Sequence, residues 1–168
     1  MLIAERKPEW EYHVGQYVCQ HQSRFNQLID YFYSGDALLS HRAALIILTA
    51  NDLKPQWVEK QVPKLIKSLS PDTPVWFRRS ILRILQYQQI PESLWGHAAD
   101  QCFNYLSSGD QSVAVKVFSM TVLYNLTRRI PDLARELRLT IEAQYELGSA
   151  GYKARARKIL KELARDGH

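Results

Sequence analysis

The sequence predicts an all-α fold, an α-α superhelix of about four stacked antiparallel helix pairs. Apolar residues follow a helical rather than an alternating period, as Val115, Phe118, Val122 and Leu126 do at i, i+3, i+7 and i+11. Similar apolar segments end at Leu48, Leu85, Leu123 and Leu160, at spacings of 37, 38 and 37 residues. Self-similarity at intervals of about 20–50 residues is typical of a solenoid.

Two further series of residues define the repeating unit. Segments ahead of the first series end at Asp36, Asp72 and Asp110, and prolines at 55, 91 and 131 precede three helices. Proline suits the first position of a helix, because the N–H that it lacks would have no helical partner there. Each unit is therefore predicted to be a helix started by proline, a tight turn with Gly or Asp, and a second helix.

The predicted helices pair in chain order. They span 16–33 with 40–51, 56–69 with 75–88, 92–107 with 112–129, and 132–147 with 151–165. One domain is expected over 1–168, with an N-terminal cap segment at 1–15 and repeats at about 16–51, 55–88, 91–129 and 131–165. Neighbouring pairs must stack, because no pair can bury its apolar faces alone.

Composition excludes several classes of protein. The chain has 168 residues, 46% apolar and 23% charged, which is typical of one globular domain. No run approaches the ~20 apolar residues of a membrane span, and charge by residue 5 argues against a secretory leader. Two cysteines are too few for a disulfide framework, so we expect a cytoplasmic protein. The histidines and cysteines lack the spacing of a metal site, and no cofactor is predicted.

An acid in the turn, followed six residues later by a base, makes the chain resemble the HEAT-like, armadillo-type family of α-solenoids. The pairs are Asp36 with Arg42, Asp72 with Arg78, and Asp110 with Lys116. The resemblance implies a structural ladder in which each base bridges to the turn acids of its own or the next repeat. The fourth unit departs from this pattern, because Leu147 precedes Lys153 at the place of the acid.

Positive charge gathers on the second helices. They hold 13 of the 22 lysines and arginines and one acid, Glu162, whereas the first helices hold six bases and eight acids. In the family that the chain resembles, second helices line the concave surface. A basic concave face is therefore implied, and its candidate binding residues are Arg79, Arg83, Arg155, Lys158 and Trp76. The alternative is that these charges only solvate the outer surface of a terminal repeat.

No sequence motif indicates catalysis. Nucleotide-binding and nucleophile-elbow motifs are missing, and the basic helices lack paired carboxylates. Alkylation-repair glycosylases share HEAT-like repeats, but no central acid accompanies Trp76 in the predicted groove. The fumarase/adenylosuccinate lyase superfamily is also helical, and its Gly-Ser-Ser-x-Met-Pro loop is missing here. We expect a non-enzymatic scaffold that binds an acidic protein or peptide, with no membrane partner; the alternative is a nucleic-acid-binding HEAT-like protein with a glycosylase-like groove.

Overall fold

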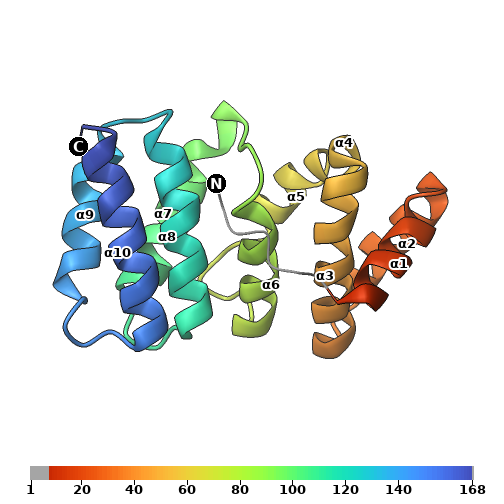
Figure 1. Ribbon diagram of the computed structural model, residues 1–168. Coiled ribbons are helices and arrows are strands. Elements are labelled where there is room, and N and C mark those ends of the chain that lie inside the picture. The colour runs from red at the N-terminus through yellow and green to blue at the C-terminus, as the bar shows by residue number, and fades with distance from the viewer. Residues whose placement is uncertain (1–7, 168) are drawn as a thin grey trace. The chain divides into compact units, whose positions relative to one another are not determined.

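A computed structural model describes residues 8–167 and shows an all-α fold (Figure 1). This part of the chain contains ten α-helices and one 3₁₀ turn, and no strand. The predicted fold class, helices packed in neighbouring pairs, is confirmed. The chain divides into two compact units, Met1–Gln61 and Val62–His168, each of which is described separately. The repeat boundaries and the single domain stay predictions, and the first seven residues of the expected cap segment lie outside the described residues.

The first unit is organised around one long helix. Its helices are α1 (Glu9–Val18), α2 (Gln22–Phe32), α3 (Ala37–Leu53) and α4 (Pro55–Glu59). The central helix α3 packs against the other three. Its apolar residues meet Phe25 and Phe32 from α2 and Val58 from α4, all of which are fully buried. Burial of this apolar area is the main favourable contribution to the stability of the unit.

The predicted helix at 16–33 is in fact two helices, α1 and α2. The guanidinium of Arg24 explains the break, because it donates through Nη1 to the carbonyl oxygen of Tyr17 at 3.0 Å and to Oε1 of Gln20 at 2.7 Å. It also stacks on the Tyr17 ring, 3.8 Å from the centroid. The carbonyls at the end of a helix need such donors. Residues 9–15 of the expected cap segment are helical and belong to α1.

The second unit consists of two layers of helices. Its helices are α5 (Val62–Lys67), α6 (Val75–Leu85), α7 (Trp95–Ser107), α8 (Val113–Thr127), α9 (Leu133–Ala143) and α10 (Ala150–Arg165), with a 3₁₀ turn at Glu92–Leu94. Contacts join α6, α8 and α10 in one layer, and α5, α7 and α9 in the other. Figure 1 shows α6, α8 and α10 side by side along one face of this unit.

Helix α8 lies at the centre of the second unit and packs against α6, α7, α9 and α10. Most of its sequence is apolar, and Val115, Met120, Val122 and Leu123 are almost completely buried. A helix that is apolar on most sides is buried on most sides. The composition of this helix therefore fixes its central place.

Prolines explain the other departures from the predicted helices. The helix expected at 56–69 is interrupted between α4 and α5, since Pro63 lacks an N–H and its ring would clash with the carbonyl of Glu59 in a continuous helix. Pro55 does occupy the first turn of α4. Pro91 and Pro131, by contrast, lie just ahead of the helices that they were expected to start.

Arg78 differs most from its predicted ladder role. Its Nη2 donates to the carbonyl oxygens of Pro71 at 3.0 Å and Thr73 at 2.8 Å, and its Nη1 donates to Oε1 of Gln111. The guanidinium lies 4.2 Å from the centroid of the Tyr105 ring, and the residue is only 4% exposed. We infer that the hydrogen bonds of Arg78 hold the turn before α6 against the connection between α7 and α8.

The acids of the expected ladder do not contact its bases directly. Asp36 accepts from the backbone N–H of Leu39 at 2.7 Å and so caps α3, while Arg42 is exposed. Asp72 is exposed and is not among the partners of Arg78.

In the third pair, Lys116 donates through Nζ to Oε1 of Gln144 at 2.6 Å, and Asp110 accepts from Ser108 and Gln111. Carbonyl and amide oxygens thus accept the hydrogen bonds of Arg78 and Lys116 for which carboxylates were predicted.

We predict that Arg78→Met lowers the free energy of unfolding by about 2–4 kcal/mol, because buried carbonyl groups lose a charged donor. Arg79→Met is the matched control, since Arg79 is exposed on the same helix. It should change stability by no more than about 0.5 kcal/mol, as should Asp72→Ala. Urea denaturation followed by circular dichroism measures all three. If Arg78→Met unfolds at the same urea concentration as Arg79→Met, the hydrogen bonds of Arg78 do not contribute to stability.

A second prediction concerns the contact between α1 and α3. A Cβ at Gly15 would lie 2.4 Å from Cγ2 of Thr49, so Gly15→Ala should cost about 1–3 kcal/mol through overpacking. Gly96 in α7 has open space around it, and Gly96→Ala should leave stability unchanged or raise it by up to about 1 kcal/mol. The same denaturation curves compare the two variants. If both variants have the same free energy of unfolding, the close packing of α1 on α3 at Gly15 is contradicted.

Candidate functional site

The layer of α6, α8 and α10 is strongly basic. These helices carry ten lysines and arginines and one acid, Glu162, whereas α5, α7 and α9 carry four bases and three acids. One side of the layer packs on α7 and α9, and the other side faces away from them. We call this outer side of α6, α8 and α10 the basic face. Cations on it have few acids of the same layer to neutralise them.

Helix α6 contributes Trp76, Arg79 and Arg83, which follow one another at about one-turn intervals on one side of the helix. Arg79 is exposed. Arg83 is half-buried, and its guanidinium lies over the ring of Phe118 on α8, 5.6 Å from the centroid. Trp76 is half-buried with its ring 5.4 Å from that of Phe77. These contacts place Arg83 at the border between α6 and α8.

Helix α8 contributes a narrow apolar stripe to the basic face. Ala114, Val117 and Phe118 are half-buried, and Asn125 continues the same side of the helix two turns later. Most of the remaining α8 residues are buried, apart from Val113 at its start and Lys116, so this stripe is the part of α8 that meets solvent on the basic face. We call these four residues the α8 stripe.

Helix α10 contributes Arg155 and Lys158. Arg155 donates through Nη1 to Oγ1 of Thr121 on α8 and to Oε1 of Gln86 after α6, the latter at 3.4 Å. Asn125 donates through Nδ2 to the carbonyl oxygen of Gln86 at 3.0 Å. These bonds connect the three helices of the layer, so Arg155 stabilises the basic face as well as charging it. Lys158 is exposed one turn further along.

The structure thus brings the five predicted binding residues onto one layer. Arg83 borders the α8 stripe on one side and Arg155 on the other, and Arg79 lies one turn before Arg83 on the same side of α6. The sequence analysis missed Phe118 and Gln86, which connect these arginines to their neighbours. Phe118 entered the sequence analysis only as a member of the helical period of α8, and a single glutamine gives no sequence signal.

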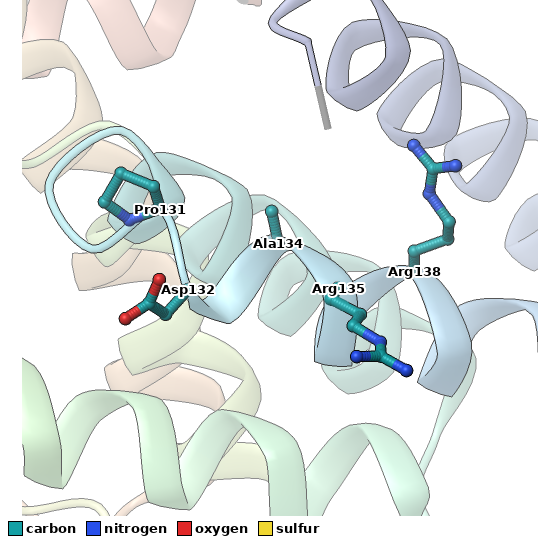
Figure 2. Close-up of a pocket in the computed structure, with 5 residues that line it drawn as sticks. All are labelled: Pro131, Asp132, Ala134, Arg135 and Arg138. Atoms are coloured by element: carbon teal, nitrogen blue, oxygen red, sulfur yellow. The ribbon is translucent and has the colours of Figure 1, made fainter.

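Two hollows lie elsewhere in the second unit. One, of about 390 Å³, lies at the start of α9 beside Pro131, Asp132, Arg135 and Arg138. Figure 2 shows the guanidinium groups of Arg135 and Arg138 pointing to different sides of α9, so the two cations do not converge on one ligand. We do not treat this hollow as a binding site.

The other hollow, of about 510 Å³, lies where α7 turns into α8 and α9 turns into α10. We call it the turn cavity. Its walls include Gln111, Val113, Lys116, Gln144, Leu147 and Tyr152.

Among residues 8–167, no cluster of three or more His, Cys, Asp or Glu side chains could hold a metal ion. Cys19 and Cys102 are buried and unpaired, and burial raises the pKa of the Cys102 thiol to about 12. A thiol with such a pKa is a poor nucleophile at neutral pH.

Between residues 8 and 167, no helix combines the length and the apolar character needed to span a bilayer.

A family model described as a HEAT repeat domain matches residues 7–163. The chain belongs to the HEAT repeat domain family. Searches among curated proteins and among solved structures gave no significant match. The predicted family is therefore confirmed, although the acids and bases from which it was inferred are arranged differently. HEAT repeat domains commonly serve as protein-interaction scaffolds and are generally non-enzymatic.

We predict that the polar contacts of Arg155 contribute to packing within this HEAT repeat domain. Arg155→Met should lower the free energy of unfolding by about 1–2 kcal/mol, since Thr121 and Gln86 lose a charged donor. Lys158→Met, at an exposed position of the same helix, should change it by no more than about 0.5 kcal/mol. Urea denaturation compares the two. Equal stability of both variants would assign Arg155 to the solvated surface alone.

Proposed function

We propose that this HEAT repeat domain is a non-enzymatic scaffold whose basic face binds an acidic segment of a partner protein. The observation that carries the proposal is the separation of charge between the two layers of the second unit. The layer with the basic face holds ten bases and one acid. A surface of one sign attracts segments of the other sign and rejects segments of its own.

The α8 stripe supports a protein segment as the occupant. Phe118 and Val117 offer apolar contact area between cations on α6 and cations on α10. An amphipathic helix fits such a surface, because its apolar residues at i, i+3 or i+4, and i+7 can cover the stripe while flanking acids face the arginines. Aromatic and arginine side chains are also the residues that contribute most to binding energy at protein interfaces.

Nucleic acid is the second candidate that the charge permits. A nucleic acid would use the cations for its phosphates, and its affinity would fall steeply as salt rises. The apolar α8 stripe favours the protein segment, because it gives a phosphate backbone nothing to contact. The salt dependence of binding therefore distinguishes the two occupants.

The test is a binding titration with labelled probes. We predict that a helical peptide with leucines at i, i+4 and i+7, flanked by glutamates, binds more tightly than a scrambled peptide of equal charge. The double variant Arg79→Glu, Arg83→Glu should lower the affinity for the peptide by about tenfold or more, because its glutamates would then meet negative charges. Fluorescence anisotropy measures binding, and circular dichroism checks the fold of each variant.

The matched control is Lys67→Glu with Arg135→Glu, which makes the same change in net charge on exposed positions of α5 and α9. It should bind the peptide as the unchanged protein does. Equal loss in both double variants would show that only the total charge matters. Tighter binding of single-stranded DNA than of the peptide, with a steep salt dependence, would replace the protein segment by nucleic acid.

A further inference from the structure

The turn cavity contains a single charged lining residue, Lys116. Its Nζ donates to Oε1 of Gln144 at 2.6 Å, and Nε2 of Gln144 donates to the carbonyl oxygen of Leu106 at 2.7 Å. An ammonium group has three donors, and an amide oxygen is a neutral acceptor. The charge of Lys116 is therefore held in place by Gln144 but not neutralised by it.

No acid is among the described residues that line the cavity. Arg78 donates to Gln111 in the cavity wall, and Gln111 donates in turn to Asp110, which is the acid that acts on Lys116. Asp110 therefore acts on Lys116 from outside the lining, while Arg78 stays buried behind Gln111. Burial lowers the pKa of Lys116 and Asp110 opposes this effect, as expected for an ammonium group partly removed from water. A ligand with one negative charge would pair with the ammonium group of Lys116, the charged residue of the lining.

The last repeat gives the cavity an apolar rim in place of an acidic one. Leu147 occupies the turn position at which the preceding repeat has Asp110, and its side chain is 95% exposed. Val113, 44% exposed, adds further apolar surface at the rim, and the buried Tyr152 lies in the wall. Exposed apolar groups beside a cation favour a ligand that has both an anionic and an apolar part.

We propose that the turn cavity binds a carboxylate carried on a small aliphatic group. The ammonium of Lys116 donates to the carboxylate, the amide groups of Gln111 and Gln144 line the pocket around it, and the aliphatic group packs on Val113 and Leu147. Two sources present this chemistry: a free aliphatic acid, and the C-terminal residue of a peptide.

This site is separate from the basic face. Lys116 and Phe118 are two residues apart on α8, which places them about 200° apart around the helix. Ligand binding in the turn cavity therefore does not depend on the acidic segment proposed for the basic face, and variants of Arg79 and Arg83 should leave it unchanged.

The test uses N-acetyl-leucine as the probe, with N-acetyl-leucinamide as the neutral control. Titration of the ¹⁵N-labelled protein should shift the amide signals of residues 107–116 and 144–152. The neutral amide should bind about tenfold more weakly or worse, because it lacks the charged acceptor. Equal binding of acid and amide, or shifts at other residues only, would overturn the proposal.

Two variants test the assigned residues. Lys116→Met should lower the affinity for N-acetyl-leucine by about tenfold, and Lys116→Arg should keep most of that affinity. Leu147→Asp adds a negative charge at the rim and should lower the affinity for N-acetyl-leucine. The fold should be unaffected, since Leu147 is exposed. Leu139→Asp on α9, also exposed, is its matched control and should bind as the unchanged protein does. Unchanged binding in Lys116→Met, or equal loss in both leucine variants, would refute the site.

Peptides ending in leucine, with a free or an amidated C-terminus, distinguish the two sources. A free-ended peptide that binds more tightly than N-acetyl-leucine assigns the cavity to a peptide terminus. Equal affinity of the two assigns it to a small aliphatic acid. Binding of the amidated peptide as tightly as the free-ended one would contradict a carboxylate site of either kind.

Discussion

Burial of one positive charge constrains the second unit of this HEAT repeat domain more than any other interaction. Arg78 is 4% exposed, and a guanidinium cannot lose its proton to escape the cost of burial. Acceptors must therefore be brought to it. The turn at residues 70–73 supplies carbonyl oxygens, and Gln111 supplies an amide oxygen from the next helix pair. The shape of that turn and the approach of the next pair follow from the same requirement, while Tyr105 covers the face of the guanidinium.

Neutral acceptors satisfy the bases of this chain where the repeat pattern predicted acids. Asp72 and Arg78 stand six residues apart in sequence, yet the carbonyls of the turn lie closer to the guanidinium than the exposed carboxylate does. A carboxylate buried there would lose its own hydration, and that loss offsets much of the Coulomb attraction. An exposed acid still acts through space, as Asp110 does on Lys116. The acid six residues before a base therefore marks the turn in sequence without being the partner of that base.

The fold could be predicted from the sequence further than the site could. Helical period and repeat spacing were enough for the fold class, because these patterns follow from backbone geometry and burial, whereas the expected helices at 16–33 and 56–69 are each two helices. The break between α1 and α2 could not be predicted, since it depends on the contacts of Arg24 with Tyr17 and Gln20. The charge of the basic face was visible in the sequence. Its contacts through Phe118 and Gln86 were not, because they join residues from different repeats.

Helix α8 shows why binding and folding are separable in this domain. Most of its circumference is core, so substitutions at Val115 or Met120 act on stability. The α8 stripe and Lys116 both meet solvent, and they lie on different sides of the helix. Helix α8 therefore presents the α8 stripe, between arginines, on one side and the ammonium group of Lys116 on another. Because both surfaces are held by the same buried core, a loss of core packing would affect both together, whereas a change of charge on one surface leaves the other in place.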